Sequence, residues 1–339
     1  LYAGIDLHSN NSFLVVIDAS NRVIYEKRLK NDLDEVCNAL GRYADDLAGV
    51  AVESTYNWYW LVDGLQAAGY SVHLANTVAI NQYSGLKHSD DKSDARWLAQ
   101  MLQLDILPEA YIYPAEWRPI RDLLRKRSFI VRDRTANILS IQNVITRNTG
   151  QRPPSATRVE KLTPEDIAGM DAPDEVLLSI GGSAAMVRSA NEQIALLEAA
   201  VRKRVSPTDT FKNLTTVDGI GEILGWTILL ETGNIWRFPT VGNYASYARC
   251  VRGARISNGK KKSEVNEKHG NAYLSWAFSE AAQHAIRYNS KVARFYQRKL
   301  AKKHMMIARR TVAHKLARAC YYIQRDGVPF DVDKVFGGK

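Results

Sequence analysis

The sequence opens with Leu-Tyr-Ala-Gly-Ile-Asp-Leu at residues 1–7, and this stretch decides the fold of the first third of the chain. Its apolar residues predict a strand over Tyr2–Leu7. Two more β-rich stretches follow at Ser12–Ala19 and Arg22–Lys30, and the residues Ala19-Ser20-Asn21 are typical of a tight turn between them. The chain is therefore predicted to begin with three strands in close succession.

Helices and strands alternate after this opening. Apolar periodicity predicts helices over Asp34–Leu47, Trp60–Ala68 and Lys92–Leu104, and buried strands over Gly49–Glu53 and Tyr70–Ala75. The predicted order is β-β-β-α-β-α-β-α, which is the order of the ribonuclease-H-like fold, a mixed sheet covered by helices. We expect residues 1–110 to form an α/β domain of this kind.

The rest of the chain is predicted to be mainly helical. Residues 111–208 are expected to form a basic helical connection, in which one long helix over 115–149 pairs with Met186–Arg204 as a coiled hairpin, with short helices between them. Residues 209–339 are expected to form a mainly α-helical domain that ends in the basic, amphipathic helix Lys302–Gln324.

Charge is distributed unevenly along the 339 residues, whose net charge is +10. Residues 1–110 carry 8 Lys/Arg against 15 Asp/Glu, whereas residues 201–339 carry 26 against 10. The basic part predicts a polyanionic partner, although solvated surface lysines are an alternative. No run of about 18 uncharged apolar residues predicts a membrane span, and the three cysteines have no metal-type spacing.

Four acidic residues stand where a metal site could form. Asp6 lies in the first strand and Glu53 ends the fourth. These two strands are neighbours in the ribonuclease-H-like fold, so the two acids are expected to project from adjacent strands. Asp91 and Asp94 are three apart at the start of a helix, so that they share one face. Divalent ions that promote phosphoryl chemistry need several convergent carboxylates. We predict that these four residues bind metal. Each of them alone could instead be a turn or capping residue, and Asp90 is a rival ligand.

A glycine turn lies near the start of the last domain. Val217-Asp218-Gly219-Ile220-Gly221 precedes the apolar helix Ile223–Leu230. Such turns let backbone N–H groups at a helix start approach a phosphate closely, so Gly219 and Gly221 are predicted to contact nucleic acid. A plain turn between two helices is the alternative.

A polar loop over Ala248–Lys262 carries six basic residues and the hydroxyl of Ser257. A nucleophilic serine needs a base or a metal and a cationic cradle for phosphate. The loop offers such a cradle in Arg255, Lys260, Lys261 and Lys262, without an obvious base. An ordinary turn with solvated lysines explains the same residues. In the long basic helix, Arg118, Arg125 and Arg132 are candidate contacts to nucleic-acid phosphates, and a partner helix from a second subunit could cover its apolar side.

These motifs together resemble one known family. Gly-Ile-Asp in the first strand, Glu-Ser-Thr after the fourth and the run Asp91–Arg96 look like the DEDD-type insertion-sequence transposases, which are bridge-RNA- or seek-RNA-guided recombinases. The amino domain of that family resembles Holliday-junction resolvases. The glycine turn fits as well, with Asp218 where many members have proline, and so does the closing Gly327-Val328-Pro329-Phe330.

The resemblance implies a recombinase that mobilises an insertion sequence, while a structured non-coding guide RNA pairs with donor and target DNA. It implies that Ser257 is the nucleophile, with Ser263 as the main competitor and Ser275 and Ser279 beyond it. The four acids would hold Mg²⁺ or Mn²⁺. Family members assemble as dimers and tetramers, in which the serine of one subunit completes the acid site of another. A cytoplasmic prokaryotic protein that acts at the nucleoid is implied.

Two other functions remain open on the sequence. In a metal-dependent, junction-resolvase-like endonuclease the acids would hydrolyse DNA and Ser257 would be an ordinary loop residue. In a non-catalytic nucleic-acid-binding protein the acid cluster would have no chemical role.

Overall fold

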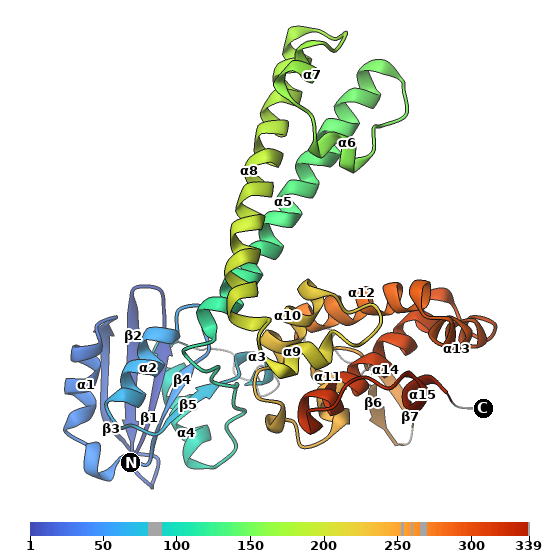
Figure 1. Ribbon diagram of the computed structural model, residues 1–339. Coiled ribbons are helices and arrows are strands. Elements are labelled where there is room, and N and C mark those ends of the chain that lie inside the picture. The colour runs from blue at the N-terminus through green and yellow to red at the C-terminus, as the bar shows by residue number, and fades with distance from the viewer. Residues whose placement is uncertain (81–89, 252–253, 259, 265–269, 338–339) are drawn as a thin grey trace. The chain divides into compact units, whose positions relative to one another are not determined.

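The chain forms two compact units, Leu1–Ala115 (the N-terminal unit) and Glu116–Lys339 (the C-terminal unit), in a computed structural model (Figure 1). The structure describes residues 1–80, 90–251, 254–258, 260–264 and 270–337. The predicted parts 111–208 and 209–339 both lie in the C-terminal unit, apart from residues 111–115. Within the described ranges, no helix is long and apolar enough to cross a membrane.

A five-stranded mixed sheet forms the centre of the N-terminal unit, as predicted. Its strands are β1 (Tyr2–Leu7), β2 (Asn11–Ile17), β3 (Val23–Lys30), β4 (Gly49–Glu53) and β5 (Val72–Ala75). The order across the sheet is β3-β2-β1-β4-β5, with β1, β2 and β3 antiparallel and with β4 parallel to both β1 and β5. The predicted strands are confirmed to within two residues at their ends.

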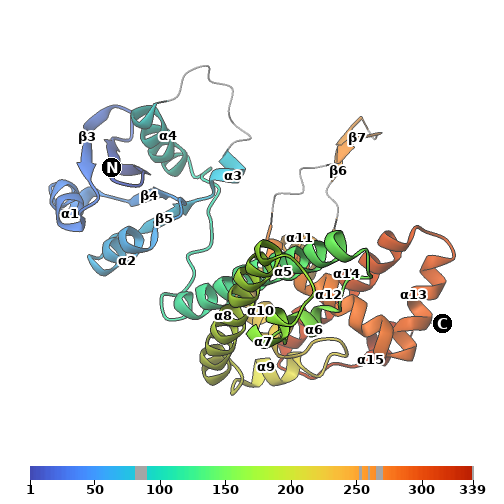
Figure 2. The same ribbon diagram turned by 90° about the horizontal axis from the view of Figure 1, so that it is seen from above.

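Helices cover both faces of this sheet (Figure 2). Helices α1 (Leu33–Gly41) and α2 (Tyr59–Ala67) pack on the face that carries the alternate β1 residues Ala3, Ile5 and Leu7. Helix α4 (Asp91–Gln103) packs on the opposite face. Two short elements, η1 (Ala44–Asp46) and α3 (Thr77–Ile80), lie in the connections. The single helix predicted over Asp34–Leu47 is wrong in extent, because α1 ends at Gly41 and a separate 3₁₀ turn follows.

Gly4 sets the distance between α4 and the sheet. A methyl group at this position would overlap the carbonyl oxygen of Ala95 and lie 2.7 Å from the amide nitrogen of Ala99, both in the backbone of α4. The helix therefore lies directly on the backbone of β1. Ala95 and Ala99 are fully buried and pack with Val15 and Ile17 of β2, which holds this contact closed.

Two long helices form the arm of the C-terminal unit (Figure 1). Helix α5 (Arg118–Thr149) pairs with α8 (Asp174–Val205), with α6 (Ala156–Glu160) and α7 (Pro164–Ala168) between them in the chain. The sequence predicted this hairpin but placed the start of its second helix at Met186, about one dozen residues too late. The extra turns of α8 bury Ile180 and Ala184 against α5, a tertiary contact that local periodicity does not reveal.

The other elements of the C-terminal unit surround a second core. They are α9 (Asp209–Leu214), α10 (Glu222–Thr232), η3 (Ile235–Arg237), α11 (Val241–Tyr247), β6 (Ala254–Ser257), β7 (Lys260–Glu264), α12 (Ala272–Tyr288), α13 (Ser290–Leu300), α14 (Met305–Asp326) and α15 (Val332–Phe336). Tyr244 and Phe278 are fully buried in this core. The mainly helical character predicted for this part is confirmed.

Gly4→Ala tests the contact between α4 and the sheet. The added methyl group meets backbone atoms that no side-chain rotation can move, so we expect a loss of about 3 kcal/mol or more in the free energy of unfolding, at the upper end of overpacking costs. Denaturant unfolding of the full chain measures this. Gly41→Ala is the matched control, because no atom lies within 4 Å of a methyl group there, and its stability should change by about 1 kcal/mol at most. Equal stability of the two variants would contradict the contact.

Candidate functional site

Asp6 and Glu53 lie at the same edge of the sheet. They stand at the carboxyl ends of β1 and β4, which are parallel neighbours with Ile5 paired to Val52. Asp6 is only 3% exposed, although it carries a carboxyl group. The sequence predicted this juxtaposition from the strand order, and the structure brings the two residues together.

The first turn of α4 supplies the other acids. Asp90 is the N-cap of this helix, and its Oδ1 accepts a hydrogen bond of 2.7 Å from the backbone N–H of Ser93. Asp91 instead accepts a hydrogen bond of 2.6 Å from Arg28 Nη2 of β3. Capping therefore occupies the Asp90 carboxylate, and this geometry favours Asp91 over Asp90 as the residue that faces the strand acids.

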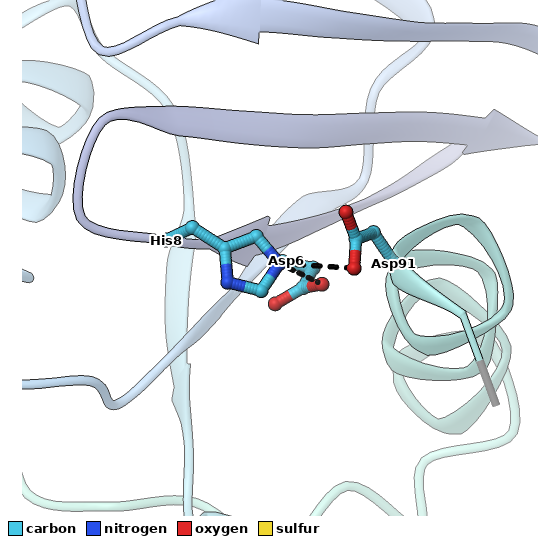
Figure 3. A group of neighbouring side chains, drawn as sticks. All are labelled: Asp6, His8 and Asp91. Carbon is cyan, nitrogen blue, oxygen red and sulfur yellow. Dashed lines mark ion pairs between the residues drawn. The ribbon is translucent and has the colours of Figure 1, made fainter.

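His8 contacts two of the acids through one ring nitrogen, and sequence reasoning did not identify it (Figure 3). Its Nε2 is 3.1 Å from Asp6 Oδ2 and 3.2 Å from Asp91 Oδ1. One ligand atom each of Asp6, His8 and Asp91 lies within 4.8 Å of the others, a spacing that could hold a metal ion. The signal in the sequence was the spacing Asp6-Leu7-His8, because residues two apart in an extended chain point to the same side.

Glu53 and Asp94 join this group through their electrostatics. Desolvation raises the pKa of Glu53 to about 8, together with a hydrogen bond that protonated Glu53 donates to the Asp6 carboxylate and the negative charges of Asp6 and Asp94. The pKa of Asp94 is also raised, by desolvation and then by the charge of Asp6. Arg28, and after it His8, lower the pKa of Asp91. Crowded carboxylates whose pKa values separate in this way are typical of functional sites.

The donor set fits a divalent cation. Carboxylate oxygens are the ligands that Mg²⁺ and Mn²⁺ prefer, and a histidine nitrogen is better suited to Mn²⁺ than to Mg²⁺. A cation would also relieve the repulsion that raises the pKa of Glu53. Asp6, His8 and Asp91 could therefore hold a divalent metal ion, with His8 as a donor that the sequence did not predict.

The glycine turn has a structural role at one of its two glycines. Gly219 has φ +92°, and a methyl group there would lie 2.5 Å from the oxygen of Ala281 and 2.6 Å from the nitrogen of Ala285, so its backbone lies directly against α12. Gly221 is the N-cap of α10 and has open space around it. A cavity of about 700 Å³ adjoins it, lined by residues 215–224, His284 and Tyr288. Phosphate contact at the Gly221 end remains a prediction.

The segment with Ser257 forms two strands rather than the loop that was predicted. Strand β6 pairs antiparallel with β7, and cross-strand backbone pairing defines this ribbon. Ser257 pairs with Lys260, next to the turn at Asn258, whereas Ser263 pairs with Arg255 farther from the turn. Arg255 and the three lysines Lys260, Lys261 and Lys262 all lie on these two strands. Backbone pairing therefore places Ser257 at the tip of the hairpin.

A buried polar network lies at the start of α12, which follows β7 in the chain. Glu231 of α10 is 2% exposed and accepts two hydrogen bonds from Arg125 of α5, at 2.7 and 2.8 Å. The same carboxylate accepts a hydrogen bond of 2.8 Å from Asn271 Nδ2. Asn271 is also the N-cap of α12, where it accepts hydrogen bonds from the backbone N–H groups of Tyr273 and Leu274. Arg125, Glu231 and Asn271 thus join α5, α10 and the start of α12.

The three arginines predicted to contact nucleic acid from α5 lie in different surroundings. Arg118 is buried, at 4% exposure. Arg125 forms the bidentate ion pair with Glu231. Arg132 is exposed on the surface of α5. Position along a basic helix did not reveal these differences in exposure: Arg118 is buried, Arg125 is half-buried and Arg132 is exposed. Their contacts with nucleic acid stay predictions, and Arg132 is the most accessible of the three.

Comparison with known proteins identifies two family models in chain order. Residues 3–148 match a model of DEDD transposases of the IS110 type, and residues 211–297 match the model described as "Transposase IS116/IS110/IS902 family". A comparison with curated proteins gave no match. The first range contains the acid cluster, and the second contains the glycine turn and the Ser257 hairpin. The chain therefore belongs to the IS110 family of DEDD transposases and is a DNA transposase.

Proposed function

We propose that this transposase cuts and rejoins DNA strands through the hydroxyl of Ser257, with a divalent cation bound by the acid cluster and with a structured RNA as its guide. The observation that carries the proposal is the convergence of Asp6, His8 and Asp91, with Glu53 and Asp94 coupled to Asp6 through their charges and with the pKa of Glu53 raised to about 8. Such a concentration of negative charge is unfavourable unless a cation balances it.

Asp6, His8 and Asp91 would be the first ligands of the cation, and Glu53 and Asp94 would complete its surroundings. Bound there, Mg²⁺ or Mn²⁺ supplies positive charge that stabilises the oxygens of a reacting phosphate. Arg28 holds Asp91 through a bond of 2.6 Å, and it also donates to Asn11. This bond fixes the orientation of the Asp91 carboxylate, which is the usual function of a residue that contacts a metal ligand.

Ser257 would attack a DNA phosphate. A bond forms between its Oγ and phosphorus, the bond from phosphorus to the leaving sugar oxygen breaks, and that oxygen takes up a proton as the serine loses one. The DNA end stays attached as a phosphoserine until the hydroxyl of another strand displaces it. The position of Ser257 at the tip of a basic hairpin supports this role over that of Ser263.

Donor DNA, target DNA and a non-coding guide RNA are the proposed partners, because the resembled family uses RNA to read sequence. A homodimer or homotetramer is proposed as well. Large apolar side chains remain exposed on both helices of the arm, which supports a partner helix there: Phe129, Leu139, Leu178, Met186 and Leu196.

The serine mechanism predicts a covalent intermediate. Incubation with Mg²⁺, substrate DNA and guide RNA should give a protein–DNA adduct that resists denaturation, which gel electrophoresis detects. Ser257→Ala should abolish this adduct and Ser263→Ala should retain it. Metal-dependent cleavage without any adduct would support the resolvase-like endonuclease instead, and no cleavage by either route would favour the binding protein.

The acid cluster predicts a pH-dependent stability. Between the ordinary pKa of 4.5 and about 8, the folded protein holds a proton on Glu53 that the unfolded chain has released. Stability contributed by this group is therefore lost as pH rises through that range and changes little above about 8. Glu53→Gln should remove this component, so that the variant melts at a higher temperature than the parent above pH 8 in the absence of metal.

Added Mg²⁺ or Mn²⁺ should reverse the order of the two melting temperatures, so that the parent melts above Glu53→Gln. The cation displaces the proton from the cluster, so it should raise the melting temperature of the parent more at high pH than at low pH, and raise that of Glu53→Gln less. Thermal melts across pH, with and without chelator, measure both effects. Parallel pH profiles of the parent and the variant would contradict the assigned cluster.

The different surroundings of Arg125 and Arg132 predict that substitution of the first lowers stability and that substitution of the second weakens nucleic-acid binding. Arg125→Ala leaves Glu231 buried without its ion pair and should destabilise the C-terminal unit by about 3 kcal/mol or more. Arg132→Ala should leave stability within about 0.5 kcal/mol and lower the salt dependence of nucleic-acid binding. Denaturant unfolding and salt-dependent binding assays separate the two. Equal effects on stability would show that the ion pair contributes little.

A further inference from the structure

A second cavity lies in the C-terminal unit, between α13, α14 and α15. It has a volume of about 560 Å³. Among the residues that the structure describes, its lining contains four cationic side chains and two aromatic rings, and no acid: Phe295, Arg298, Lys299, Lys302, Lys315 and Phe336, with Ala301 beside them. It is distinct from the cavity at the glycine turn, and neither the sequence motifs nor the serine mechanism uses it.

The two buried rings lie close to Lys299 and Lys315. Lys315 Nζ lies 5.2 Å from the ring centroid of Phe295 and 5.5 Å from that of Phe336, and Lys299 Nζ lies 5.4 Å from Phe295. Phe295 and Phe336 are 8% and 4% exposed, so they form the floor of the cavity. Ring faces attract cations without neutralising them, and the positive charge therefore remains available to a ligand.

Protein groups do little to balance the charge of Lys315. Lys315 Nζ donates a hydrogen bond of 2.6 Å to the backbone oxygen of Val335, a neutral acceptor. Burial lowers the pKa of Lys315, and the neighbouring charges of Arg318 and then Lys299 lower it further. The single acid of α15, Asp333, forms an ion pair with Lys291. Like charges gathered around a hollow repel one another, and an anion in the hollow would remove that cost.

We propose that the cavity formed by Phe295, Arg298, Lys299, Lys302, Lys315 and Phe336 binds backbone phosphates of a nucleic acid on which this transposase acts. Lysines bind phosphate as point charges, and an arginine can bind it through two donors. The rings are too buried to stack with bases, so recognition is of the backbone and is independent of sequence. The inference rests on membership of a DNA transposase family and does not depend on Ser257.

The test uses the full chain without divalent metal, so that binding is measured apart from strand cleavage. Lys299→Gln with Lys302→Gln removes two exposed charges. We expect binding of a mixed-sequence DNA duplex or of an RNA hairpin to weaken by roughly fivefold to tenfold at low salt. The slope of log affinity against log salt should fall by about 1 to 2, because each phosphate contact contributes about 0.9.

Lys161→Gln with Lys203→Gln is the matched control, since it removes the same net charge at two exposed positions of the same unit. DNA and RNA carry the same phosphate group. The probe that loses more affinity shows whether the bound phosphates belong to DNA or to RNA. An equal loss in both double variants, or no loss on either probe, would overturn the proposal. So would competition by poly-glutamate as effective as competition by the nucleic acid, because an acidic protein segment would then be the ligand.

Lysine acylation read by mass spectrometry provides a local measurement. Nucleic acid should protect Lys299 and Lys302 from an amine-reactive reagent in the parent protein and should leave Lys161 and Lys203 reactive. Protection of neither Lys299 nor Lys302 at saturating nucleic acid would overturn the assignment even if the substitutions weakened binding. Unchanged melting temperatures of the double variants would confirm that the fold is intact.

Discussion

The contact of α4 with β1 at Gly4 determines where two of the four acids lie. Backbone meets backbone at this point, so α4 approaches the sheet more closely than any side chain would permit. Asp91 and Asp94 stand in the first turn of that helix. The contact therefore fixes their distance from Asp6, which lies on β1 two residues after Gly4. The acid cluster therefore depends on the absence of a side chain two residues before Asp6.

Charge crowding is the second consequence of that contact. Asp6 is almost completely buried, and the pKa of Glu53 rises to about 8 beside it. In the absence of metal this arrangement opposes folding above pH 8, and the hydrophobic core around Ile5 and Val52 offsets the cost. A site that binds a cation tightly must keep its ligands close together before the cation arrives, and that requirement conflicts with maximal stability.

The basic side chains of the C-terminal unit occur in two kinds of surroundings. Where Arg125 meets Glu231, the charges are paired, hydrogen-bonded and largely buried, and they connect the arm to the start of α12. Around Lys315 the positive charges gather over aromatic rings with little compensation. A cation that is paired with a buried carboxylate is not available to a ligand, whereas a cation that stands among other cations can bind an anionic ligand. The same composition of basic residues thus gives a structural network in one place and a candidate phosphate site in another.

The sequence by itself determined the strand order, the neighbouring positions of Asp6 and Glu53, the arm and the family, because period-2 and period-3.6 patterns and short motifs are local. Only the tertiary structure decided that His8 joins Asp6 and Asp91, that Asp90 caps α4, and that the Ser257 segment pairs as two strands. It also decided which basic side chains face inward. These properties depend on contacts between residues far apart in the chain, and a linear pattern of residue types does not specify which partner each side chain will meet.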